Sequence, residues 1–282
     1  MLMILISSLS LAYVDEACRE TADTDGDGTA GPAPEGYSEQ GQQDFLLNFF
    51  SLATTFSPVH APIPQAGGTG SAGLEVAIIP PLPCSRRLVL DYTKTEDTNK
   101  TPAAPRPRVS FSMPARDTGI GTVVPYGSFG YVPPITFAGT RNVIVSVEAG
   151  VGVSPNEGGG VQYGLRYHAT LMKTVAEIAT PFNEGDPEAL DFYMGSTFGV
   201  DAMFGYRTKK WTPYAALGFT DVSTFFYIDD DGLVINNEDP YAGLAISAGT
   251  QWRMAEHWQS AGELYIAPGN IFTGRLRFSY LF

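Results

Sequence analysis

Histidine is the residue type in this chain best suited to act as a general base, and the chain contains three histidines. A nucleophile that such a base activates must lie within hydrogen-bond distance, so on a strand both residues must fall on one face. His257 and Ser260 fall on opposite faces of an alternating segment, and the neighbour of His168 on its own face is Thr170. His60 lies in the proline-rich sequence PVHAPIP, where we expect a loop. The sequence therefore predicts that the protein is not an enzyme.

The sequence DTDGDG places Asp23, Asp25 and Asp27 at the spacing that begins a calcium-binding loop. In an EF-hand the twelfth loop position supplies a bidentate glutamate, but here it is Pro34, and Glu35 follows one residue late. The departure removes the strongest ligand. A flexible acidic linker is the favoured interpretation, and weak calcium binding is the alternative. We expect no other cofactor.

Cys18 and Cys84 are the two cysteines of the chain. In an oxidising compartment outside the cytoplasm, an even count permits one disulfide between them. Two free thiols are equally compatible with the sequence, so both alternatives stay open.

Several segments alternate strictly between apolar and polar residues, which predicts strands with one apolar and one polar face. In VQYGLRYHATL (161–171), the large apolar residues occupy odd positions and the polar residues even positions. The polar faces of such segments carry the charged and titratable residues Glu75, Arg108, Glu148, Arg166, His168, Asp201, Arg253, Glu263, Arg275 and Arg277. Because an Arg or Lys facing lipid at mid-depth costs roughly 2–4 kcal/mol, this placement indicates a membrane barrel with a polar interior.

The pattern predicts an all-β, antiparallel, up-and-down barrel of about twelve strands, within a range of ten to fourteen. The expected strands cover 45–56 (the least certain), 71–80, 86–94, 106–114, 121–132, 141–153, 161–171, 191–206, 210–228, 240–253, 256–266 and 270–282. Connections at 81–85, 115–121, 154–160, 207–210 and 254–256 are short, whereas the alternate set at 58–70, 95–105, 173–190 and 229–239 is longer. Short turns facing the periplasm and longer loops facing outward are typical of outer-membrane barrels.

The three tryptophans test this sidedness independently. Trp211, Trp252 and Trp258 fall on the apolar faces of their strands, close to short turns. Amphipathic rings prefer the interface between membrane and water, so these residues, with Tyr280 and Phe282, are expected to form the inner aromatic girdle.

The last nine residues, GRLRFSYLF, place Leu276, Phe278, Tyr280 and Phe282 on one face, with a terminal phenylalanine. This ending resembles the C-terminal strand of bacterial outer-membrane β-barrel proteins. The resemblance implies recognition of that strand by the barrel-assembly machinery and residence in the outer membrane among lipids and lipopolysaccharide. The last strand must also pair with the first, because an unpaired backbone edge is too costly in hydrocarbon. A soluble β-sandwich or lipocalin-like barrel is the alternative.

The composition agrees with export and argues against nucleic acid as a partner. The chain has 30 acidic and 17 basic residues and a net charge of −13, whereas phosphate backbones require clustered positive charge. Residues 1–12 (MLMILISSLSLA) have a short apolar run and end in small residues, which predicts a signal peptide. Residues 13–44 predict a flexible acidic periplasmic extension. Residues 45–282 would form the barrel, with 45–70 as first strand or plug.

Two functions remain open at this point. If the inward acids and bases segregate, they line a water-filled path, and the first hypothesis is a porin-like passive channel for small solutes. If they pair across the lumen, they fill a narrow barrel, and the second hypothesis is a plugged structural or surface-interaction barrel. A lipid-modifying enzyme is the third hypothesis.

Overall fold

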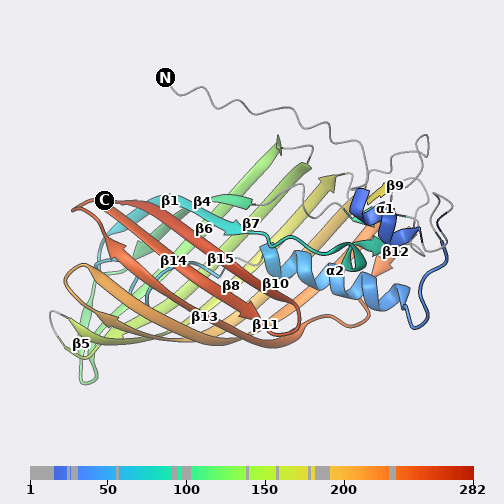
Figure 1. Cartoon of the computed structure of the whole chain (residues 1–282). Helices are drawn as coiled ribbons and strands as arrows, with labels where there is room; N and C mark the ends of the chain where they lie inside the picture. Colours follow the sequence, from blue (N-terminus) through green and yellow to red (C-terminus); the bar gives the residue numbers. More distant parts are fainter. Residues whose placement is uncertain are drawn as a thin grey trace.

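The structure is a computed structural model that describes residues 16–23, 26, 31–54, 57–89, 94–96, 103–137, 140–156, 159–176, 179–181, 191–228 and 233–282. The expected signal peptide lies outside the described residues. Ten long antiparallel strands close into one barrel (Figure 1). They are β1 Gly70–Ile78, β4 Ala103–Ser112, β6 Gly121–Phe137, β7 Thr140–Ser154, β8 Gly160–Ala176, β10 Asp191–Arg207, β11 Trp211–Ile228, β13 Ala242–Arg253, β14 Trp258–Ala267 and β15 Ile271–Leu281.

Closure requires the last strand to pair with the first, as the sequence predicts. β15 is antiparallel to β1, with Leu281 opposite Ser71 and Leu276 opposite Val76. The final residue continues the ladder, because the backbone N–H of Phe282 donates to the carbonyl of Gly70 over 3.0 Å. Along the described residues every barrel strand therefore has two neighbours, as a ring closed against hydrocarbon requires.

The remaining elements are short or lie at the barrel ends. β5 Arg116–Thr118 pairs with β6, and β12 Leu233–Asn236 pairs with β11 outside the ring. β2 Leu88–Val89, β3 Lys94–Glu96 and β9 Ala179–Pro181 form a separate small sheet. The helical elements are α1 Glu16–Ala22, α2 Glu39–Thr54 and the single turn η1 Cys84–Arg86. No helix in the described ranges is both long and apolar enough to cross a membrane.

The expectation of about twelve strands is corrected to ten in the ring, inside the range that the pattern allowed. Two of the expected strands are the difference. Residues 45–54 of the first belong to α2, because the run FLLNFF lacks strict alternation and is buried as a helix, and residues 55–56 lie outside the described residues. Of residues 86–94, Leu88, Val89 and Lys94 belong to the small sheet, where Leu88 is buried against Cys18 and Ala22, and residues 90–93 lie outside the described residues.

The two faces of the barrel strands differ as the alternation predicts. On β8, Leu165 is 54% exposed whereas its neighbour Arg166 is 1% exposed. Phe204 on β10 and Leu276 on β15 are likewise exposed, while Asp201 and Arg275 on the same strands are buried. An apolar outer belt around a polar interior is the arrangement that hydrocarbon imposes.

The barrel has a short-turn end and a long-loop end. Residues 113–120, 155–159, 208–210 and 254–257 connect strands at the short-turn end, beside Gly70 and Phe282. The described residues of the connections between β1 and β4, between β8 and β10 and between β11 and β13 lie at the long-loop end. The prediction of a short turn at 81–85 is wrong, because these residues are part of the longer connection between β1 and β4. Figure 1 shows β5 and the C terminus at the end opposite α2.

The N-terminal boundaries also differ from the expectation. Residues 39–44, expected in a flexible periplasmic extension, are the first turns of α2, and residues 16–22 form α1. Both helices lie at the long-loop end rather than at the short-turn end (Figure 1). The segment at 58–70, expected as an outer loop, instead crosses the lumen. Of the two alternatives for residues 45–70, first strand or plug, the structure shows the plug.

Candidate functional site: a filled lumen

Helix α2 fills the lumen at the long-loop end. Its side chains Phe49, Leu52 and Ala53 are buried against the inward faces of four strands. The partners are Val222, Ala245, Tyr265, Ala267 and Ile271. On another side, Leu47 packs with Ala77, Ile144, Met172 and Tyr193 from β1, β7, β8 and β10. The helix therefore contacts strands around most of the barrel wall.

Polar contacts fix the axial position of α2. The Asn48 amide nitrogen donates to the Asp239 carbonyl over 2.9 Å, and its amide oxygen accepts from the Tyr241 N–H over 2.9 Å. One turn closer to the C-terminal end of α2, the hydroxyls of Ser51 and Tyr193 lie 2.5 Å apart. A buried helix with satisfied polar groups behaves as a core element.

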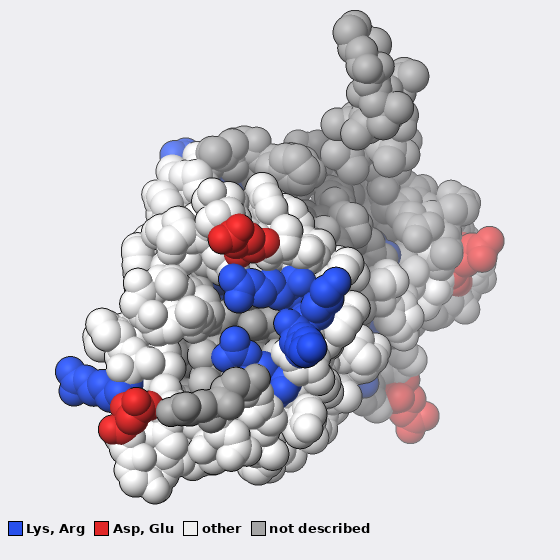
Figure 2. All heavy atoms as spheres, turned by 90° about the vertical axis from the view of Figure 1, so that its left-hand side faces the viewer, with Lys and Arg blue, Asp and Glu red and all other residues white. Residues whose placement is uncertain are grey.

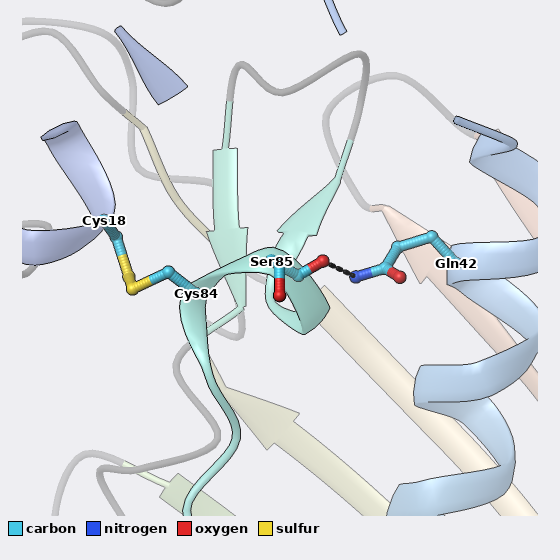
Figure 3. The surroundings of a disulfide bond; sticks show 4 residues. All are labelled: Cys18, Gln42, Cys84 and Ser85. Carbon is cyan, nitrogen blue, oxygen red and sulfur yellow. Dashed lines mark hydrogen bonds between the residues drawn. A yellow bond between two sulfur atoms is a disulfide. The ribbon is translucent and has the colours of Figure 1, made fainter. Parts of the chain in front are cut away.

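A disulfide joins the segment before α2 to the connection between β1 and β4. Cys18 in α1 is bonded to Cys84 in η1, with Cα atoms 5.1 Å apart (Figure 3). Next to this bond, the Gln42 amide donates to the Ser85 carbonyl over 3.4 Å. The N-terminal segment is thus attached to the long-loop end both covalently and through α2.

Residues 57–65, called here the lumen segment, continue from α2 towards the short-turn end. Its main chain forms hydrogen bonds with side chains from opposite sides of the barrel wall. The Pro58 carbonyl accepts from Arg166 of β8 over 2.6 Å, and the Val59 N–H donates to Glu75 of β1 over 3.3 Å. Further down, the Gln251 side chain of β13 accepts from the Ala61 N–H over 3.1 Å. The lumen segment therefore crosses the interior instead of following one wall.

His60 places an imidazole in the middle of the lumen. Its Nε2 lies 2.8 Å from Glu148 Oε1, and its Nδ1 lies 2.6 Å from the Ala61 carbonyl. Both ring nitrogens face oxygen atoms, so the imidazole links the wall carboxylate to the main chain of the lumen segment. The sequence-based expectation that His60 is a loop residue misses this role.

Acids and bases on the wall pair with one another. Glu75 accepts from Arg106 and, over 2.8 Å, from Arg108. Asp201 pairs with Arg166 over 2.6 Å. Longer pairs of 3.8 Å join Arg108 to Glu148 and Arg275 to Glu263, and His168 lies 3.3 Å from Asp201. The acids and bases are therefore paired rather than segregated, but each pair joins neighbouring or next-neighbouring strands along the wall and none crosses the lumen among the described residues.

The structure places the predicted interior residues as follows. Glu75, Arg108, Glu148, Arg166, His168, Asp201, Glu263, Arg275 and Arg277 are all buried inside the barrel. Arg253 instead lies exposed at the rim of the short-turn end. Arg106 was missed, although it shares the parity of Arg108, because it stands at the first position of the expected strand between Pro105 and Pro107.

Three inward glycines make room for the lumen segment. A Cβ at Gly152 would collide with the Pro62 carbonyl and lie 2.5 Å from Ile63 Cγ1. A Cβ at Gly205 would lie 2.9 Å from Pro62 Cδ, and one at Gly164 would lie 3.4 Å from Pro62 Cβ. Because these three positions have no side chain, Pro62 can pack closely against the inner faces of β7, β8 and β10. These glycines were visible on the polar faces of the alternating segments, but their purpose was not.

The expected girdle residues gather on the outer surface of the short-turn end. The rings of Trp211 and Trp252 stack at 4.9 Å, and Trp258 stacks on Phe278 at 4.9 Å. Tyr280 contacts Trp258 at 5.2 Å, and Phe282 contacts Phe111 at 6.2 Å. All five predicted girdle residues are exposed, as an interfacial belt requires.

The expected calcium loop is only partly described. Asp23 Oδ1 accepts from the Gly26 N–H over 2.7 Å, whereas Asp25 and Asp27 lie outside the described residues. Within the part of the chain that is described, no group of three or more His, Cys, Asp or Glu side chains could hold a metal ion.

A closed antiparallel barrel with a lipid-facing apolar belt, an aromatic girdle and a polar interior defines an outer-membrane β-barrel. The fold of the described residues is therefore that of an outer-membrane β-barrel, the class that the C-terminal strand resembles. No known family pattern matches the chain. No curated protein is similar to it in sequence.

Solved structures with a similar fold are outer-membrane barrels. The translocator domain of the autotransporter NalP from Neisseria meningitidis matches with 10% identity and a TM-score of 0.41, over 77% of this chain and 89% of its own. The COG4313 outer membrane channel from Pseudomonas putida F1 matches with 14% identity and a TM-score of 0.39, over 80% and 100%. Ail of Yersinia pestis, an attachment invasion locus protein, matches with 13% identity and a TM-score of 0.34, over 76% and 97%. At these values we draw nothing from them on function.

Proposed function

We propose that the protein is a plugged outer-membrane barrel that does not conduct solutes and whose long-loop end serves as a surface for interactions. Lipopolysaccharide or partner cells would be contacted by the outward loops and the attached N-terminal segment. The lumen would act as a structural anchor for that segment.

The observation that carries this proposal is the course of the lumen segment. Its residues 58–61 form hydrogen bonds with wall residues on four strands around the ring. These wall residues are Glu75 of β1, Glu148 of β7, Arg166 of β8 and Gln251 of β13. A solute would have to displace the segment and separate buried ion pairs to pass. This supports the plugged barrel over the open porin-like channel.

Single-channel recording in planar bilayers tests the proposal. The refolded full chain should be silent, and a variant that lacks residues 13–66 should give steady openings because the lumen is emptied. Heat-modifiable migration in a gel checks that each barrel is folded. A matched variant that lacks residues 13–37 loses the disulfide but keeps α2 and the lumen segment, so it should stay silent. Steady, ion-selective openings of the full chain would overturn the proposal.

A further inference from the structure

A cavity of about 250 Å³ opens at the short-turn end, next to the point where the lumen segment leaves the barrel. Ile63 and Gln65 of that segment line it, together with wall residues of β8, β11, β13 and β14. The cavity is slightly smaller than the roughly 300–1,000 Å³ typical of sites for drug-sized ligands. It therefore suits a small molecule.

The cavity is cationic although the chain as a whole is acidic. Arg207, Lys209, Lys210 and Arg253 line it, and Glu256 is the acid among its lining residues. Figure 2 looks onto this end and shows Lys and Arg side chains gathered around its centre. In the described part of the chain, no carboxylate forms an ion pair with Arg207, Lys209 or Lys210. Since the chain has a net charge of −13, such a grouping is unlike the rest of the molecule.

One neutral group in the lining also lacks a partner. Gln162 is 1% exposed, and its amide oxygen has no hydrogen-bond partner among the described residues. The neighbouring glutamines differ, because Gln251 and Gln259 both donate to the Pro64 carbonyl, over 3.2 and 3.1 Å. A buried acceptor without a donor is costly, and a ligand hydroxyl could satisfy it.

We propose that this cavity binds a small phosphate ester that carries hydroxyl groups, of the glycerol phosphate class. Arginine and lysine are the side chains best suited to a phosphate, and Gln162 would accept a hydrogen bond from a hydroxyl of the carrier. The phosphate could come from a free solute at the short-turn side or from the headgroup of an anionic phospholipid. The second source is within range because the stacked pair Trp211 and Trp252 marks the membrane interface beside Lys210 and Arg253.

Isothermal titration calorimetry with sn-glycerol 3-phosphate tests the site in the refolded full chain, in neutral detergent at low ionic strength. We expect saturable binding that the double variant Lys209→Gln/Lys210→Gln weakens at least tenfold. Arg253→Gln serves as a second variant. Arg116→Gln removes one positive charge from the same end but outside the lining, so it should leave binding unchanged. Gln162→Leu should weaken binding of glycerol phosphate more than that of methyl phosphate, which lacks hydroxyls.

Nanodiscs distinguish the two sources. A site for a free solute gives equal affinity in phosphatidylcholine discs and in discs that also contain phosphatidylglycerol. A headgroup site loses the calorimetric signal in the second kind of disc, because the lipid already occupies the cations. Absence of binding in detergent and in both discs would overturn the proposal, and so would an equal loss in Arg116→Gln.

Discussion

The two halves of the filled lumen are held by different physics. At the long-loop end, α2 buries Phe49 and Leu52 against apolar wall residues, so the free energy comes from apolar surface removed from water. Towards the short-turn end, hydrogen bonds and a buried contact between His60 and Glu148 hold the lumen segment, in addition to the apolar packing of Ala61 against the wall. Apolar packing allows neighbouring side chains to shift when one of them is changed. A buried ion pair does not, because the loss of one partner leaves the other charge buried and uncompensated.

The largest effect is expected for Glu75→Ala in the polar half. This change leaves Arg106 and Arg108 buried without their shared carboxylate and should lower the free energy of unfolding by about 3–5 kcal/mol. Urea titration of the refolded barrel measures it. Glu256→Gln at the exposed rim is the control, with a change within about 0.5 kcal/mol. A loss in Glu75→Ala no larger than in the control would contradict the importance of pairing.

The next effect concerns the helix-filled half. Leu52→Ala removes a fully buried side chain from the α2 cluster and should cost roughly 3 kcal/mol. If the two halves are independent, this loss and that of Glu75→Ala add within about 0.5 kcal/mol in the double variant. A larger deviation in the same urea titration would show that the two halves respond as one unit.

A smaller effect on stability, but a direct effect on the plug, is expected for Gly152→Leu. The new side chain occupies the place of Pro62 and Ile63, so the lumen segment must shift, at a cost of about 1–3 kcal/mol. Planar-bilayer recordings should then show intermittent openings. Gly119→Ala, in the turn between β5 and β6 with open space around the added Cβ, alters no lumen contact and should stay silent. Silence of both variants would mean that the segment can repack without opening a path.

The smallest effect is expected for Ser51→Ala. It removes the hydroxyl partner of Tyr193 within an otherwise apolar contact and should cost about 1 kcal/mol. Thermal unfolding followed by heat-modifiable gel migration measures the shift. In Ser51→Ala the Tyr193 hydroxyl keeps its contact with the Leu47 carbonyl at 3.5 Å, and a Tyr193→Phe/Ser51→Ala double variant measures what that remaining contact contributes.

Much of the barrel could be predicted from the sequence because lipid allows so few arrangements. Strand parity followed from the cost of charge in hydrocarbon, and it placed Arg166, Asp201 and Arg275 inside. The cost of an unpaired backbone edge in hydrocarbon predicted the pairing of β15 with β1. Interface preference predicted where Trp211, Trp252 and Trp258 lie.

The errors fall where local pattern does not determine structure. The run at 45–50 fits a buried helix as well as a strand, and only the space inside the closed barrel selects the helix. Residues 86–94 alternate like a strand of the ring, yet Leu88 is buried against α1. His60 carried no local signal, because its partner Glu148 is 88 residues away.

The sequence by itself therefore determined three expectations: a membrane environment, which side chains of each strand face inward and which outward, and the closure of the ring. Each follows from the residues of single strands. The tertiary structure alone decided what occupies the interior. Whether Glu75, Glu148 and Asp201 face water or arginine depends on barrel diameter and on the path of residues 39–65 through it. Those quantities arise only when ten strands close around the segment, because the contacts that fill the lumen join residues far apart in the chain.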